Sequence, residues 1–313
     1  MIIKRKEKTM KTIKLLLATD CSEGVMNAER YAVQFAIGIG AHLTVLHVYE
    51  APLSSAMAVF DPEKTEEDPG SSELKNIRER MGQLIRSMGA LTDGLDFECV
   101  VREGDTATQI REEAKESGTD LIITGTHDSG KFRELFLGSH TWEVMKKTEI
   151  PVLAIPQDAH YEPIRHLVFA TEYRAEELPV IQSLVELAKR MDASFTVVHM
   201  SNYSLSKPVE AMLFEQFRHE LRAMVSYEKM KISLIHHEDL VEGLNNFCMA
   251  READWLAVCS GKSKLSDVLF NPGPRLSRRL SFHTRMPLLV IPDEYQLAEW
   301  GLLEFVEKQQ KNE

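Results

Sequence analysis

The chain has 313 residues, of which 43% are hydrophobic and 27% are charged, and its formal net charge is −11. These proportions are typical of a folded globular protein and exclude collagen-like, low-complexity and wholly disordered chains, because enough apolar material is present to offset the conformational entropy lost on folding. The acidic balance argues against general affinity for nucleic acid or for an anionic membrane. No stretch approaches the ~18 apolar residues that span a bilayer, and no apolar segment follows the basic start as in an export signal.

The cysteines are few for this length and lack the C-x-x-C spacing, so they indicate neither a disulfide framework nor a cysteine zinc site. There are four of them: Cys21, Cys99, Cys248 and Cys259. Reduced thiols and the absence of an export signal lead us to expect a soluble cytoplasmic protein. Mostly polar residues precede Met10, which is therefore an alternative start to Met1.

An internal repeat organises the chain. The segment 17–20 (LATD) matches 169–172 (FATE), and 43–48 (LTVLHV) matches 195–200 (FTVVHM). In both pairs the second member lies 152 positions after the first, from 17 to 169 and from 43 to 195. Two copies of one module explain this constant offset.

The later matches lie closer together. Residues 119–123 correspond to 253–257, which is 134 positions on, and 150–156 corresponds to 286–292, which is 136 positions on. The second copy therefore has a shorter middle. We expect one domain at 1–156, a second at 163–295, and a charged C-terminal extension at 296–313 that is helical.

In the first copy, short apolar runs alternate with amphipathic stretches, which is typical of βαβ units and a parallel sheet. Strands that are apolar at consecutive positions fit a sheet covered on both faces. In chain order we expect a strand at 13–18, a helix at 22–37 capped by Ser22, a strand at 43–48, an acidic loop at 51–72, a helix at 72–88, a strand at 97–102, a helix at 106–116, a strand at 120–124, a helix at 139–147 and a strand at 151–155. The strands of the second copy are expected near 165–170, 194–200, 231–236, 254–259 and 287–291.

The segment after the fourth strand, residues 125–139, is the first candidate for a ligand site. Ligands of open α/β sheets bind beyond the carboxyl ends of the strands. Its glycines allow close approach of a phosphate, and the helix start at Ser139 supplies donors and positive partial charge. The same glycines also fit a simple turn into the next helix.

Both halves of the chain resemble the universal stress protein domain. The resemblance rests on the Ala-Thr-Asp after the first strand, the His-Val of the second, the Gly-Thr-His after the fourth and the later Gly-Ser. It implies two tandem Rossmann-like α/β domains, each a five-stranded parallel sheet with helices on both faces. It also implies that the domains pair through their final strands, 151–156 and 287–292, within one chain, with a homodimer and an unknown protein partner left open.

The nucleotide-binding members of that family hold ATP with a G-x2-G-x9-G-[ST] motif. Carried over to the first copy, the resemblance puts Asp20 on the adenine side and Val48 beside the base, and it makes Gly125, Gly138 and Ser139 the phosphate-binding positions. His127 and Gly130, which lie within the same segment, complete the expected site. The resemblance therefore implies ATP or another adenine nucleotide as ligand, with Mg²⁺ as its companion.

Both copies depart from this motif. Asp128 stands at the second glycine, and a carboxylate repels phosphates unless a cation lies between them. The second copy departs further, since it has Lys262 in place of Asp128 and two prolines near its third glycine position, which remove backbone donors. The remaining replacements are Glu172 for Asp20, Met200 for Val48 and Cys259 for Gly125. We therefore expect the second copy to be structural.

Other signals are weaker. The segment from Gly125 to Lys131 fits most of a P-loop, but Phe132 replaces the hydroxyl that would bind Mg²⁺. We expect Gly38 and Gly40 to end a helix, and His236 with His237 to form a strand-end polar cluster. No spacing assembles a nucleophile with a base, which argues against an enzyme and leaves slow ATP hydrolysis open. The alternatives to a nucleotide-binding stress-response protein are thus a nucleotide-free interaction scaffold and a weak ATPase.

Overall fold

The computed structural model describes residues 12–49, 69–87, 95–126, 143–145, 148–203, 205–260 and 286–292. Its strands form one ten-stranded sheet in the order β3-β2-β1-β4-β5-β10-β9-β6-β7-β8. The first five strands are β1 (Lys14–Thr19), β2 (His42–Tyr49), β3 (Phe97–Glu103), β4 (Leu121–Gly125) and β5 (Val152–Ile155). The others are β6 (His166–Ala170), β7 (Ser194–Ser201), β8 (Met230–His236), β9 (Trp255–Cys259) and β10 (Leu288–Ile291). Each begins and ends within one residue of the range expected from the sequence.

The strand order repeats the sequence duplication. Within each half every pairing is parallel, and the first strand of the half lies between the second and the fourth. The chain thus folds as two tandem Rossmann-like α/β domains, as expected. Residues 156–165, between β5 and β6, contain neither helix nor strand.

Helices cover both faces of the sheet. One face carries α1 (Met26–Ile39), α3 (Pro69–Ser87), α6 (Glu177–Arg190) and α7 (Lys207–Met224), whereas α4 (Thr106–Ser117) and α8 (Leu240–Ala250) lie on the other. Successive residues of a strand point to opposite faces, so Leu15 and Leu17 join the first core cluster and Leu16 joins the second. Each cluster contains residues of both halves, and the two domains therefore share their cores.

Helix α1 illustrates how the sequence specifies its element. Ala28, Ala32 and Phe35 recur at the spacing of one helical face and are buried. Gly40 ends the helix in the left-handed conformation with φ 65°, as expected for a closing glycine, and its N–H group donates to the carbonyls of the last turn.

The expected cap at Ser22 is wrong. A 3₁₀ turn, η1 (Glu23–Val25), precedes α1, and the Ser22 hydroxyl accepts no hydrogen bond from it. The Ser22 N–H group instead donates to the Asp20 carboxylate at 2.9 Å, which makes Asp20 the residue that shapes this turn. True side-chain caps occur at Asp105 and Asp239, which begin α4 and α8 at equivalent places in the two copies.

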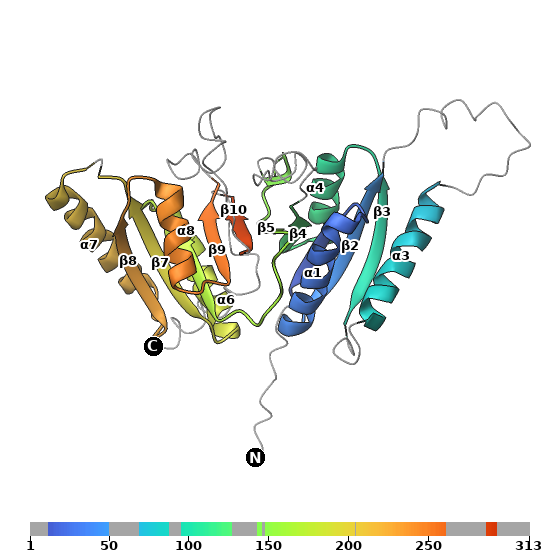
Figure 1. Cartoon of the computed structure of the whole chain (residues 1–313), viewed down its shortest axis with the longest axis horizontal. Coiled ribbons are helices and arrows are strands. Elements are labelled where there is room, and N and C mark those ends of the chain that lie inside the picture. Colours follow the sequence, from blue (N-terminus) through green and yellow to red (C-terminus); the bar gives the residue numbers. More distant parts are fainter. Residues whose placement is uncertain are drawn as a thin grey trace, which may run out of the picture.

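The two halves meet along their last strands. Figure 1 shows β5 and β10 side by side in the middle of the sheet, and Leu153 lies opposite Leu289 in an antiparallel register. An aromatic cluster reinforces this junction, because the Trp255 indole nitrogen donates to the Tyr31 hydroxyl at 2.6 Å and the Trp255 ring lies 5.0 Å from that of Phe35. Tyr31 belongs to the first half and Trp255 to the second.

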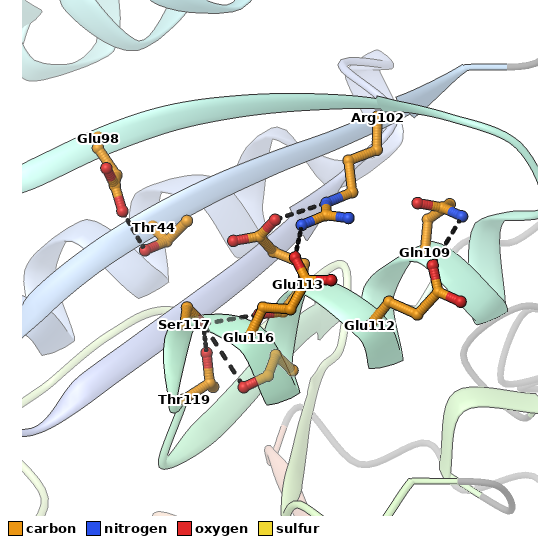
Figure 2. A network of polar contacts seen from close by, with 10 residues as sticks. Thr44, Glu98, Arg102, Gln109, Glu112, Glu113, Glu116, Ser117 and Thr119 are labelled. Atoms are coloured by element: carbon orange, nitrogen blue, oxygen red, sulfur yellow. Dashed lines mark hydrogen bonds and ion pairs between the residues drawn. The ribbon is translucent and has the colours of Figure 1, made fainter.

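A polar network ties β3 to α4 at the outer side of the first half. In Figure 2 the Arg102 guanidinium of β3 points between Glu113 and Glu116 of α4. The Nε atom of Arg102 lies 2.6 Å from the Glu113 carboxylate, and hydrogen bonds to the two glutamates raise the pKa of this arginine, starting with the bond to Glu116. A second network in the same view links Ser117 to Thr119. Among the described residues, no helix is both long and apolar enough to cross a membrane.

Candidate functional site

Three of the residues predicted to bind a nucleotide lie at the carboxyl ends of neighbouring strands. Asp20 follows β1, Val48 is the penultimate residue of β2, and Gly125 ends β4. The register pairs Thr19 with His47 and Ala18 with Thr124, so the residues after these pairs share one edge of the sheet. The order of the strands reverses at this point of the sheet, which is where open α/β sheets bind ligands.

The other predicted residues lie outside the described part of the chain. These are His127, Gly130, Gly138 and Ser139, together with Asp128 at the departing position of the motif. The predicted phosphate side of the site therefore stays a prediction.

The turn that carries Asp20 has a defined shape. Asp20 is exposed, and its carboxylate accepts a hydrogen bond from the Ser22 N–H group. Between them Cys21 adopts φ 58°, an uncommon conformation for a residue with a side chain, and its N–H group donates to the Thr19 hydroxyl at 3.0 Å. Burial raises the pKa of the Cys21 thiol to about 11, so this thiol is a slow nucleophile at neutral pH as long as it stays buried in the turn.

A buried polar cluster beneath this turn was missed by the sequence analysis. The Thr19 hydroxyl donates to the Glu29 carboxylate at 2.6 Å, and the Nε atom of Arg80 lies 3.0 Å from both oxygens of that carboxylate. Glu29 is 1% exposed, and burial of a carboxylate requires such partners. An acidic residue on the otherwise apolar face of α1 was the signal in the sequence that could have indicated this cluster.

The second half contains the same kind of cluster, in which the threonine is at the matching position but the glutamate and the arginine come from other positions. The Thr171 hydroxyl donates to Glu177 at 2.5 Å, and the Nε atom of Arg174 lies 3.2 Å from the same carboxylate. Burial raises the pKa of Glu177, although hydrogen bonds from Thr171 and Arg174 oppose this rise. Tyr173, at φ 62°, occupies the place of Cys21.

Gly125 has a packing role in addition to any ligand role. A Cβ atom at this position would lie 3.2 Å from the side chains of Val25 and Ala28. The start of α1 therefore approaches β4 closely because residue 125 has no side chain. This contact explains the glycine even without a bound phosphate.

The second half differs from the first at the position of Val48. Val48 is half-buried, whereas its counterpart Met200 is 7% exposed. The Cε atom of Met200 packs against Gly243 of α8, where an added Cβ atom would come within 2.6 Å of it. Met200 thus fills the space beside the end of β7, and it fits there because Gly243 of α8 has no side chain.

The histidines near the ends of β2 and β7 are hydrogen-bonded to the backbone. The Nδ1 atoms of His47 and His199 lie 2.9 Å and 2.7 Å from the carbonyl oxygens of Thr19 and Thr171, respectively. Burial lowers the pKa of His199, and its ring stacks on that of Tyr173 at 4.0 Å.

The pair His236 and His237 forms a polar cluster at the end of β8, as predicted. His236 Nε2 lies 2.6 Å from the buried carboxylate of Glu210, whereas His237 turns to the backbone of Asp239. Burial would raise the pKa of Glu210, but hydrogen bonds from Ser201 and His236 outweigh it and lower this pKa. Within the described residues, no group of three or more His, Cys, Asp or Glu side chains is placed to hold a metal ion.

This geometry defines a doubly wound α/β protein with a switch in strand order between β1 and β4. Residues 12–156 match the model of the universal stress protein family. A universal stress protein of Thermus aquaticus is 31% identical to this chain over 141 residues, covering 45% of this chain and 96% of that protein. Universal stress protein YxiE of Bacillus subtilis (strain 168) is 30% identical over 149 residues, covering 45% of this chain and 97% of its own length. The chain therefore belongs to the universal stress protein family.

Solved structures of similar fold, two of which follow, cover 90% or more of this chain. A universal stress protein of Archaeoglobus fulgidus DSM 4304 superposes with a TM-score of 0.61 at 15% identity and covers 90% of this chain and 98% of its own. A putative universal stress protein of Pseudomonas aeruginosa UCBPP-PA14 gives 0.59 at 17% identity and covers 94% and 97%. These likenesses concern the fold, and they extend over both halves.

Proposed function

We propose that this chain is a stress-response protein whose first half binds ATP or another adenine nucleotide without a catalytic role. The observation that carries the proposal is the convergence of Asp20, Val48 and Gly125 on one edge of the sheet, at the switch in strand order. In this proposal Asp20 faces the adenine side and Val48 lies beside the base. Gly125 begins the segment that meets the phosphates, where Mg²⁺ offsets the charge of Asp128.

The second half, in this proposal, is a structural partner. Glu172, Met200 and Cys259 stand where the first half has Asp20, Val48 and Gly125, and the last two are buried. The pairing of β5 with β10 supports a dimer-like unit formed within one chain. We thus propose a cytoplasmic protein in which the first half binds the ligand and the second half supports it structurally.

Titration calorimetry with ATP, ADP and AMP, each with and without Mg²⁺, tests the proposal. We expect binding of one nucleotide per chain, weakened by Asp20→Ala and unchanged by Glu172→Ala, which is the matched change in the second half. Absence of binding to the wild type under every condition would refute the nucleotide-binding role. Phosphate release from ATP above that of a Gly138→Asp variant would refute the non-catalytic role.

A nucleotide-free interaction scaffold is the second candidate. The contact of Val25 and Ala28 with Gly125 favours it, because packing alone accounts for this glycine. Asp128 favours it as well, through repulsion of phosphates. If only Asp128→Gly binds ATP, the scaffold is supported; tight binding of ATP by the wild type eliminates it.

A further inference from the structure

The two halves hold the turn after their first strand in different ways. In the second half the cation that neutralises the buried glutamate is Arg174, which belongs to the turn itself and lies three residues before Glu177. In the first half the cation is Arg80, which comes from the middle of α3, 51 positions after Glu29. The turn of the first half is therefore tethered to a helix that packs beside the strands.

Arg80 connects α3 to Asp20, the predicted ligand-binding residue, by way of Ser22. Its terminal nitrogen donates to the Ser22 carbonyl at 2.9 Å while its Nε atom donates to Glu29. The N–H group of the same Ser22 donates to the Asp20 carboxylate at 2.9 Å. Ser22 is thus held from α3 on its carbonyl side and orients Asp20 on its amide side.

We propose that Arg80 is a positioning residue for nucleotide binding in the first half: it fixes the turn of residues 20–22 so that Asp20 is preorganised for its ligand. This inference rests on the proposed function. A turn that is already ordered does not lose conformational freedom when the nucleotide binds, so its order contributes directly to affinity. Arg80 touches no ligand in this role and acts through Ser22.

The main test compares ATP binding by Arg80→Met and Arg174→Met. Both changes leave a buried carboxylate without its arginine, since Glu29 is 1% exposed and Glu177 is 2% exposed. They are therefore expected to lower the thermal midpoint by similar amounts, but only one of them releases the turn that carries Asp20. We expect Arg80→Met to weaken ATP binding about tenfold or more, and Arg174→Met to leave it within about twofold of the wild type.

A double variant separates positioning from charge neutralisation. Arg80→Met combined with Glu29→Gln removes the unpaired buried charge and is expected to recover stability. The tether to Ser22 is still absent, so the affinity should stay about tenfold low. Recovery of the wild-type affinity in this double variant would overturn the proposal.

A readout without nucleotide uses Cys21, which lies inside the turn. Release of the turn should speed alkylation of Cys21 by iodoacetamide in Arg80→Met several-fold, measured by peptide mapping relative to the half-buried Cys99. Arg174→Met should not change this ratio. Binding of ATP by the wild type and equally by Arg80→Met, with unchanged alkylation of Cys21, refutes the inference alone. Absence of ATP binding by the wild type refutes the proposed function and this role together.

Discussion

The hydrogen bond between Trp255 and Tyr31 offers a direct test of whether the two halves fold as one body. Tyr31→Phe removes the acceptor of the Trp255 indole N–H group and keeps the ring. Trp255 is 0% exposed and Tyr31 is 3% exposed, so water does not replace the lost partner. A buried donor without a partner costs roughly 1–3 kcal/mol, and we expect a loss of about 2 kcal/mol in the free energy of unfolding.

Urea unfolding followed by far-ultraviolet circular dichroism measures this loss. The single variants Tyr31→Phe and Trp255→Phe and their double variant form a cycle whose coupling energy isolates the bond. We expect a coupling of about 1 kcal/mol, because the double variant has neither partner left unsatisfied. Tyr227→Phe is the control within one half, since its hydroxyl donates to the Ala193 carbonyl at 2.5 Å.

The outcome also distinguishes one cooperative unit from two. If the halves share their cores, Tyr31→Phe shifts a single transition that contains the signal of both halves. A loss under about 0.5 kcal/mol, a coupling near zero, or two separate transitions of which only one moves would refute the reasoning.

Three further changes test particular contacts. Gly243→Ala should destabilise the chain by roughly 1–3 kcal/mol, because the added Cβ would lie 2.5 Å from that of His237; an unchanged thermal midpoint contradicts this. Burial lowers the pKa of His199, so the unfolded chain binds a proton at this histidine at a higher pH than the folded chain does, and the free energy of unfolding should fall as the pH drops below about 6.5. His199→Gln should reduce the dependence of the free energy of unfolding on pH, measured by urea unfolding between pH 7 and 5. An equal pH dependence in the variant and the wild type would contradict this. Arg102→Met leaves Glu113, which is 7% exposed, without its cation and should lower the free energy of unfolding, measured by calorimetry, by roughly 1–3 kcal/mol. A loss no greater than that caused by replacing an exposed arginine would show that this ion pair contributes little to stability.

The apolar runs and the repeat in the sequence predicted the order along the chain, and nearly the bounds, of the ten strands in the described part of the structure. This worked because buried parallel strands are apolar at consecutive positions, as at Leu121, Ile122 and Ile123, and because tight loops separate them from amphipathic helices. The resemblance to the universal stress protein domain supplied Asp20, Val48 and Gly125 as expected site residues, and the structure places them at one edge of the sheet. Ser22 was the local error, since a cap and a turn residue have the same sequence signature and the backbone partners decide between them.

The arginine partners of the buried glutamates beneath the turns could not be predicted from the sequence. Glu29 pairs with a residue 51 positions away, whereas Glu177 pairs with one three positions away, so no spacing rule covers both. The repeat itself was misleading here, because these glutamates are not at matching positions of the two copies. Only the tertiary packing of α3 shows that Arg80 reaches the turn of residues 20–22.

The sequence by itself thus determined the family, the duplication and the edge of the sheet at which we propose that a ligand binds, because periodicity and short motifs are local properties of a chain. The pairing of the halves through their last strands was already implied by the family resemblance, but the tertiary structure decided which side chains join them, with Trp255 of one bonded to Tyr31 of the other across 224 positions. It also decided which arginine holds the turn before α1. Both depend on which faces of distant elements meet, and buried polar groups accept only the partners that this meeting brings within hydrogen-bond distance.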